Sequence, residues 1–269
     1  MEDPIRNSIK TLTRAFYDYQ RERISLDGRI ARTKDGSLKK NAPEVDAIFI
    51  GTLIERRDGT EINGVSEKNG IIHMEEKLGK DLAKEVHTHP LWINFLVDVK
   101  GCGEAMAAVI ISEIDIHKAP TVSNLWSFAG LNPGMVPGKK KKKGVIIATD
   151  TQVRGDKLTP GFLCPFNQFL RAKLCGVLGS SFLKANSPYR EYYDNMKHRL
   201  EAEGWGMDSK NPTDKTRPKA GHQHKAATRY MVKMFLKDLY VAWRTIENLP
   251  IREPYQEEYL GHKHDKKAD

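Results

Sequence analysis

The sequence predicts a mainly α-helical protein, and two segments carry most of that prediction. Apolar side chains recur at alternating steps of four and three over residues 5–30, which gives the 3.5-residue period of a narrow helical seam. Residues 226–246 place most of their apolar side chains on one face, as in a long amphipathic helix. Only one short strand is expected, at residues 145–148.

The first helix has a clear start and an unusual length. Asp3 is a helix-capping residue, and Pro4 suits the first helical position. The seam that follows is as narrow as that of a coiled-coil strand, so we expect pairing within the chain or across a dimer; packing on a core is the alternative. The seam consists of Ile5, Ile9, Leu12, Phe16, Tyr19, Leu26 and Ile30, with Arg23 in its one gap.

The later elements follow from apolar periodicity and from glycine and proline breaks. Residues 134–160 hold six glycines or prolines and a lysine run, which predicts a long loop. We divide the chain into a coiled-coil, helical dimerisation region (1–90), a helical domain with a basic loop (91–249) and a polar tail (250–269). Helices are expected within 45–54, 65–86, 105–114, 121–129, 166–183, 188–203 and 226–246, and a second loop within 204–221.

Composition narrows the class of protein. The 269 residues are 39% hydrophobic with a formal net charge of +9, which excludes a disordered tail. No apolar run approaches the ~20 residues of a membrane-spanning helix, and the N-terminus has no apolar signal region. Cys102, Cys164 and Cys175 are odd in number and widely spaced, which indicates reduced thiols. We therefore expect a cytoplasmic protein with no membrane partner.

The positive charge is concentrated in one stretch. Residues 134–175 carry nine basic and two acidic side chains, and five of the nine form the unbroken run 139–143 between Gly138 and Gly144. Adjacent ammonium groups repel one another, so a polyanion such as a nucleic-acid backbone is a suitable partner. The alternative is an ordinary solvated loop.

A glycine-rich turn is the sharpest local motif. Gly101-Cys102-Gly103 lies between apolar residues, and Ala107 follows at the spacing of the helix-hairpin-helix unit that binds DNA. Two glycines allow a tight turn with exposed backbone N–H groups at the start of the next helix, where a DNA phosphate can bind. Such contacts position DNA and read no sequence. The alternative is a glycine turn between two core helices.

Histidine pairs suggest metal sites that the rest of the sequence does not support. His87-Thr88-His89-Pro90 resembles the H-x-H-P of JAMM-type metalloproteases, but their downstream Ser and Asp are Val97 and Lys100 here. We expect His89 and Pro90 to end the preceding helix, and no metal or cofactor is expected. Two further pairs, His222/His224 and His262/His264, are expected in solvated loops.

Several segments of residues 91–244 resemble, in order, the C-terminal serine domain of the bridge-RNA-guided insertion-sequence transposases. The matching segments are Leu96–Gly103, Leu125–Pro133, the glycine- and lysine-rich stretch 138–144, Tyr189–Gly204 and Lys225–Trp243. In that family a coiled coil joins this domain to an N-terminal RuvC-like DEDD domain, and residues 5–30 resemble the coiled coil. The resemblance implies a prokaryotic or phage-encoded protein that acts on DNA.

The chain departs from that family at both catalytic features. The resembled family carries its four metal-binding carboxylates before the coiled coil, so we do not expect them in this chain. The family's nucleophilic serine follows the block that ends at Pro133, and here Pro137 or Gly138 stands at that position. Neither side chain can attack a phosphodiester, and Thr149, Thr151 and Cys164 do not have the spacing.

We therefore expect a duplex-DNA-binding protein without strand cleavage and with no catalytic residue, acting as a homodimer. The glycine turn and the lysine run would contact the DNA backbone, and basic residues after the run would extend the surface. The expected DNA-binding residues are Lys100, Gly101, Gly103, Glu104, Lys139, Lys140, Lys141, Lys142, Lys143, Arg154, Lys157, Arg171 and Lys173.

Two other functions stay open at this point. The chain could be an active transposase component that uses a relocated hydroxyl such as Thr149, or a RuvC-like domain supplied by another chain. It could also be an RNA-binding scaffold, because the resembled family handles a guide RNA. Single-strand recognition usually needs exposed aromatic side chains for stacking. None lies between Phe128 and Phe162, which favours a binder of backbone phosphates.

Overall fold

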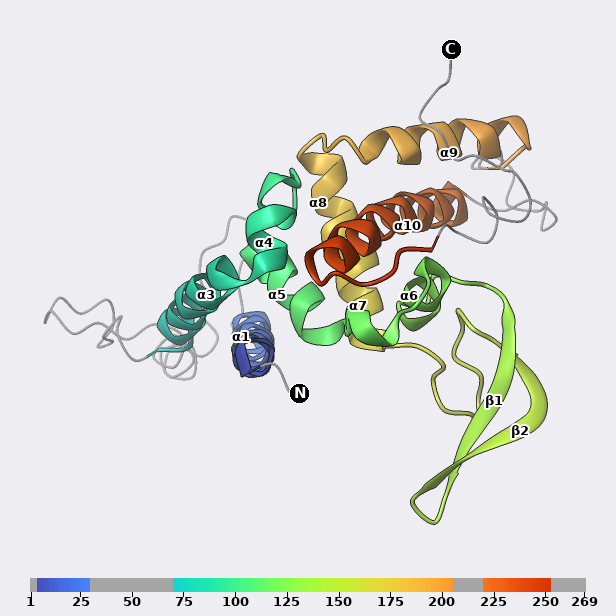
Figure 1. The fold of residues 1–269 in the computed structure, drawn as a ribbon, viewed down its shortest axis with the longest axis horizontal. Helices are drawn as coiled ribbons and strands as arrows, with labels where there is room; N and C mark the ends of the chain where they lie inside the picture. The colour runs from blue at the N-terminus through green and yellow to red at the C-terminus, as the bar shows by residue number, and fades with distance from the viewer. Residues whose placement is uncertain (1–3, 30–69, 206–219, 253–269) are drawn as a thin grey trace, which may run out of the picture. The chain divides into compact units, whose positions relative to one another are not determined.

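The computed structural model describes residues 4–29, 70–205 and 220–252 (Figure 1). The chain divides into two compact units, Met1–His89 and Pro90–Asp269. The described residues are mainly helical with a single two-stranded sheet, which confirms the predicted fold class. No helix within these residues has the length and apolar character to cross a membrane.

The described residues of the first unit form two helices, α1 (Pro4–Arg29) and α3 (Ile71–Thr88). Arg23 of α1 pairs with Glu75 of α3 at 2.5 Å, and Phe16 lies beside Gly79. Residue 23 thus lies beside residue 75, and the earlier residue 16 lies beside the later residue 79. The two helices therefore run in opposite directions. The partner of α1 observed within the chain is α3, and a coiled-coil dimer stays a prediction.

Arg23 explains the gap in the apolar seam. Its guanidinium donates to both carboxylate oxygens of Glu75, and Gln20 donates to the same carboxylate at 3.2 Å. This hydrogen bond to Glu75 raises the pKa of Arg23. On either side of Arg23, Ile9 and Leu26 of the apolar seam are buried. The charged position therefore fixes the register of α1 on α3.

The core of the second unit is built around α10 (Ala220–Ile246). Trp126 donates from its ring nitrogen to the carbonyl of Lys233, and the Tyr240 hydroxyl donates to the carbonyl of Pro120. Buried Arg244 donates to the carbonyls of Ile116, Ala119 and Pro250 and so closes the end of the helix. The described part of the unit also contains the α-helices α4 (Pro90–Asn94), α5 (Glu104–Glu113), α6 (Val122–Phe128), α7 (Gln168–Ala172), α8 (Gly179–Lys184) and α9 (Arg190–Ala202).

α5 and the segment 168–184 form the rest of the helical core. Every residue from Met106 to Ser112 is buried, because α5 is apolar on all sides. α7 and α8 are continuous through a π-helical turn, Lys173–Leu178. Gly179 permits the close crossing with α10, since a Cβ there would lie 2.7 Å from Cγ2 of Thr228.

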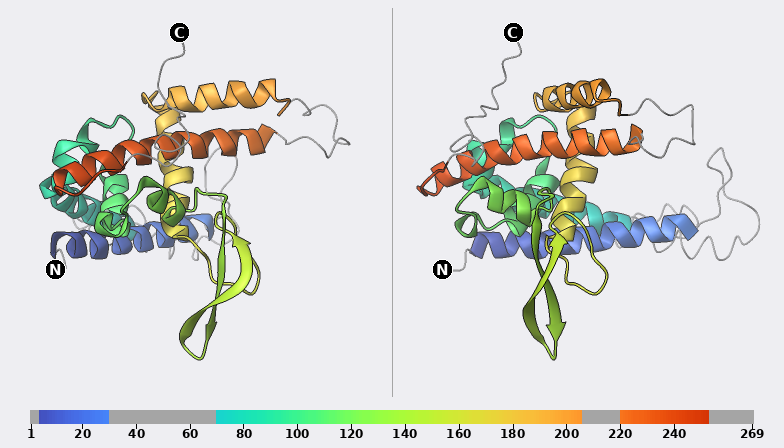
Figure 2. Two further views of the ribbon diagram at one scale, coloured as in Figure 1. Left: turned by 45° about the vertical axis from the view of Figure 1, so that its right-hand side comes forward. Right: turned by 90° about the vertical axis from the view of Figure 1, so that its right-hand side faces the viewer.

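The structure corrects two sequence predictions in this unit. Most of the loop predicted at residues 134–160 is an antiparallel hairpin of β1 (Met135–Lys142) and β2 (Val145–Arg154), and β2 contains the short strand predicted at 145–148. Figures 1 and 2 show this hairpin extending away from the helices of the unit. α10 begins six residues earlier than predicted, because Gln223 is buried and donates to the carbonyl of Lys197. The helix predicted at 45–54 lies outside the described residues.

Candidate nucleic-acid interface

The lysine run forms one strand and the tip of the hairpin. Lys142 pairs with Val145, and the two residues between them, Lys143 and Gly144, have φ angles of 48° and 84°. Positive φ at both central residues is typical of the type I′ turn, whose twist suits a two-residue hairpin. The sequence signal for this turn was a glycine followed at once by three β-branched residues, Val145 to Ile147.

All five lysines of the run are exposed. Because side chains alternate along a strand, Lys139 and Lys141 lie on one face of the ribbon, and Lys140 and Lys142 lie on the other. Lys140 also places its Nζ 4.6 Å from the centre of the Phe162 ring. Among residues 4–29, 70–205 and 220–252, none of the five has an ion-pair partner. The distal half of the hairpin thus carries uncompensated positive charge on both faces and at its tip.

Asp156 anchors the base of the hairpin. Its side chain is 5% exposed and accepts two hydrogen bonds from Arg154, at 2.9 and 3.1 Å. Arg229 of α10 lies 3.6 Å from the same carboxylate, and Arg171 of α7 donates to the Asp156 carbonyl. One buried carboxylate therefore ties the end of β2 to two core helices. Such a charge is stable in a buried position only when it is paired and hydrogen-bonded.

Two of the expected DNA-binding residues belong to this anchor. Arg154 and Arg171 point at Asp156, and the Arg171 guanidinium also lies 4.7 Å from the centre of the Phe166 ring. Lys157 follows the anchor directly and is exposed. Lys173 is half-buried in the π-helical turn, and burial lowers its pKa. Contacts of these four side chains with DNA stay a prediction.

A bulge at Gly138 interrupts the proximal half of the hairpin. The strand register shifts between Pro137 and Lys139, and the Thr149 hydroxyl donates to the carbonyl of Gly138 at 2.9 Å. The backbone N–H of Leu163 donates to the carbonyl of Lys139 at 2.7 Å, so the segment that contains Phe162 runs along β1. Backbone support from this segment reaches Lys139, Lys140 contacts the Phe162 ring, and the hairpin beyond Lys140 extends away from the helices of the unit (Figure 1).

The resembled transposases would keep their serine at the position of Pro137 or Gly138, and the surroundings of Gly138 are restricted. A Cβ at this position would lie 2.5 Å from Cδ1 of Phe162 and 3.0 Å from the carbonyl oxygen of Thr151. A serine side chain does not fit there without displacement of the Phe162 ring. The Thr149 hydroxyl is nearby, but it is engaged with the backbone of the bulge.

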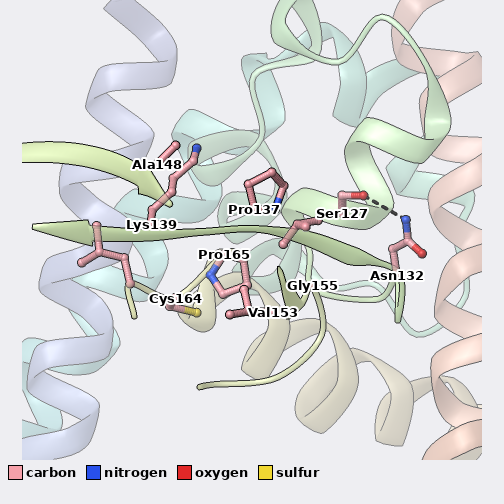
Figure 3. A pocket seen from close by; sticks show the side chains of 11 residues that line it. Ser127, Asn132, Pro137, Lys139, Ala148, Val153, Gly155, Cys164 and Pro165 are labelled. Carbon is pink, nitrogen blue, oxygen red and sulfur yellow. Dashed lines mark hydrogen bonds between the residues drawn. The ribbon is translucent and has the colours of Figure 1, made fainter. Parts of the chain in front are cut away.

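A cavity of about 460 Å³ lies beside the bulge (Figure 3). Ser127 and Asn132 face each other at one end, and Asn132 donates to the Ser127 hydroxyl at 3.2 Å. Lys139 and Cys164 supply the other polar side chains in its wall. The rest of the wall is mostly apolar or backbone: Val136, Pro137, Ala148, Val153, Gly155, Leu163 and Pro165. The cavity therefore lies between the helical core and the base of the hairpin.

The glycine turn packs closely against α8 and leads directly into the buried helix α5. Gly101 has φ of 95°, and the Ser181 hydroxyl donates to its carbonyl at 2.7 Å. Gly103 is exposed and precedes α5, which begins at Glu104. A 3-10 segment, Leu96–Asp98, lies directly before the turn, and the five-residue helix α4 precedes it. A helix-hairpin-helix unit stays a prediction, and the exposed carboxylate of Glu104 already complements the positive end of the α5 dipole.

Lys100 lies apart from the lysine hairpin. It lines a separate pocket of about 260 Å³ together with Asp98, Ser187, Tyr189 and Asp238. In that pocket the Tyr189 hydroxyl donates to Asp238 at 2.9 Å. The structure therefore divides the expected binding residues between two places, the hairpin with its base and the glycine turn.

The thiol at the centre of the glycine turn provides a test of its packing. Cys102 is buried, and burial together with nearby Glu104 raises its pKa to about 12. Its thiolate fraction at pH 8 is then roughly 1,000-fold below that of an ordinary thiol, so alkylation should be slow. We expect iodoacetamide to modify half-buried Cys164 long before Cys102 in the native protein, as read by mass spectrometry. In urea both thiols should react alike. Equal alkylation rates for Cys102 and Cys164 in the native protein would contradict the burial of Cys102.

The histidine pairs do not come together as metal sites. His89 is the residue after α3, and its backbone N–H donates to the carbonyl of Val86, which confirms that it ends that helix. The loop predicted for His222 and His224 was wrong, because both belong to α10, where His224 contacts the Tyr193 hydroxyl at 2.8 Å. His262 and His264 lie outside the described residues. The described ranges contain no group of three or more His, Cys, Asp or Glu arranged to hold a metal.

Residues 94–155 match the family model described as Transposase IS116/IS110/IS902 family. The matched segment runs from the end of α4 through the glycine turn, α5 and α6 to the end of the hairpin. The match supports a transposase-family domain in this part of the chain. A search of curated proteins and a search of solved structures each found no match.

Proposed function

We propose that this chain is a duplex-DNA-binding protein, derived from the C-terminal domain of an insertion-sequence transposase, that holds DNA without cutting it. The observation that carries this proposal is the projecting hairpin with five exposed lysines and no acidic partner among the described residues. Phosphates are the natural counter-charge for such a surface, and their contacts supply most of the affinity of sequence-independent binding.

The surroundings of the bulge support binding without cleavage. Gly138 has no space for a serine side chain, and the Thr149 hydroxyl already donates to the bulge carbonyl. A nucleophile needs a free hydroxyl or thiol held beside a base. The hairpin offers cations for the backbone and no such pair.

The proposal includes a homodimer formed through the first unit. α1 covers part of its surface with α3 and still exposes Ile5 and Ile24. A dimer would present two lysine hairpins to one duplex. Light scattering at two protein concentrations measures this directly, and a monomer at both would remove this part of the proposal.

A salt titration tests the proposed function. Each phosphate that a lysine neutralises releases condensed counterions, so five contacts predict a slope of log Kd against log salt of about 4.5 for one bound hairpin, and of about 9 for a dimer with both hairpins on the duplex. Binding of a single hairpin to a 20-base-pair duplex should therefore weaken about 500-fold between 50 and 200 mM salt, and binding of both hairpins should weaken more steeply. Fluorescence anisotropy provides the measurement. A flat response would overturn the proposal, and tighter binding to a structured RNA of equal length would redirect it to the RNA-binding alternative.

A further inference from the structure

Phosphate contacts by the β1 lysines do not explain why β2, the other strand of the hairpin, exposes apolar side chains. Val145, Ile146 and Ile147 of β2 are 62%, 62% and 46% exposed. Three consecutive β-branched side chains rarely face water in a soluble protein, and an exposed apolar cluster commonly marks an interaction surface. The position of these three residues at the projecting end makes them accessible to a large partner.

The three side chains do not share one face. Ile146 lies on the same face as Lys141, and Val145 and Ile147 lie on the opposite face with Lys142 and Lys140. A helix or sheet laid on one face would leave the other apolar side exposed. A partner that covers this ribbon must therefore surround it, as the walls of a groove do.

Cross-strand pairing gives the ribbon two chemically different edges. Lys140, Lys141 and Lys142 pair with Ile147, Ile146 and Val145 respectively, so the β1 edge is cationic and the β2 edge is apolar. A nucleic-acid groove has the complementary arrangement. Phosphates line its rim, and its floor carries apolar groups such as the thymine methyl.

The dimensions of the ribbon agree with the major groove. Two paired strands lie about 4.8 Å apart, and a major groove about 12 Å wide admits a two-stranded ribbon with its side chains. The four pairs from Lys139↔Ala148 to Lys142↔Val145 span about 10 Å at ~3.3 Å per residue, compared with a groove depth of about 8.5 Å.

We propose that the distal hairpin, residues 139–148, enters the major groove of duplex DNA. The β1 lysines contact the backbone phosphates, and Val145, Ile146 and Ile147 contact the apolar edges of the bases. This inference rests on the proposed function and adds to it a groove and a set of contacts that do not depend on charge.

Two variants separate the apolar contacts from the ionic ones. Val145→Thr with Ile146→Thr and Ile147→Thr keeps β-branched side chains in the strand and removes apolar groups. We expect its Kd for a thymine-rich 20-base-pair duplex to rise by about tenfold, with an unchanged salt slope. Lys140→Ala with Lys141→Ala and Lys142→Ala should instead lower that slope by about 2.7. The matched control is Val177→Thr with Val241→Thr, two exposed positions on helical segments of the same unit, and it should bind like the unmodified chain.

Replacing thymine by uracil in the duplex removes the C5-methyl from the major groove only. The unmodified chain should bind the uracil duplex several-fold more weakly, and the triple Thr variant should bind both duplexes equally. Thermal melting by circular dichroism confirms that each variant is folded.

The outcomes distinguish this inference from the proposed function. A steep salt slope with equal binding by the Thr variant, or with equal affinity for both duplexes, overturns the groove contacts and leaves DNA binding intact. A flat salt slope overturns the proposed function itself. A Thr variant that changes from dimer to monomer in light scattering would show that a second copy covers the apolar strand, which also overturns this inference.

Discussion

Replacement of Asp156 by alanine is expected to lower the free energy of unfolding of the second unit by about 2 to 3 kcal/mol. Asp156 is buried, and it joins Arg154 on β2, Arg171 on α7 and Arg229 on α10. Loss of one partner in a buried ion pair typically costs more, about 3–5 kcal/mol, because the remaining charge stays buried and unpaired. Here Arg154 and Arg229 are partly exposed and can regain water, which reduces the cost.

Urea unfolding measures this effect, and a matched control is available in the same hairpin. Asp150 lies on β2 and is exposed, so Asp150→Ala removes the same charge without an anchor and should change stability by less than about 0.5 kcal/mol. Limited trypsin digestion gives a second readout. Asp156→Ala should be cut faster within 139–143, because the hairpin base is no longer held. Equal unfolding midpoints for the two variants would contradict the anchor.

Alanine at all five positions from Lys139 to Lys143 should have the largest effect on binding. We expect affinity for duplex DNA at 0.1 M salt to fall by about 100-fold or more and the salt slope to fall by about 4.5 for each bound hairpin. Stability should change little, because these side chains are exposed and have no ion-pair partner in the described part of the chain. The variant also removes the packing of Lys140 against the Phe162 ring, a small term at an exposed site.

A charge-matched variant separates the lysine hairpin from net charge. Alanine at Lys10, Lys77, Lys80, Lys184 and Lys225 also removes five exposed cations, all outside the hairpin. If general attraction between a basic protein and DNA were enough, both variants would lose affinity equally. The proposal requires the hairpin variant to lose much more affinity for duplex DNA than the control variant loses. Anisotropy titrations of both variants at two salt concentrations provide the measurement.

The helices could be predicted from the sequence because their burial is periodic. Ile9 and Leu26 on α1, and Met231 and Leu239 on α10, are buried, and their spacing is visible in the chain. The same reasoning failed for the hairpin. Its distal side chains are exposed on both faces, so no alternation of apolar and polar residues exists there to reveal a strand.

The location of the candidate binding surface was predictable, but its geometry was not. The lysine run stands out in the composition, and it makes residues 134–175 the most basic stretch of the chain. The anchor was not visible, because Asp156 meets Arg171 and Arg229 from distant parts of the chain. A sequence pattern does not show which arginine is neutralised by a buried carboxylate. Arg154 and Arg171 therefore resemble free cations when only the sequence is considered.

The pairing of lysine with β-branched residues also has a consequence for solubility. A projecting hairpin offers unpaired backbone groups along its edges, and Val145, Ile146 and Ile147 are the kind of segment that adds to a strand of another molecule. Each of these residues has a lysine directly across the ribbon, and like charges on two copies oppose their edge-to-edge approach. The lysines thus act as gatekeepers against self-association. This protection weakens as salt screens the charges, so the conditions that release a polyanion also favour aggregation.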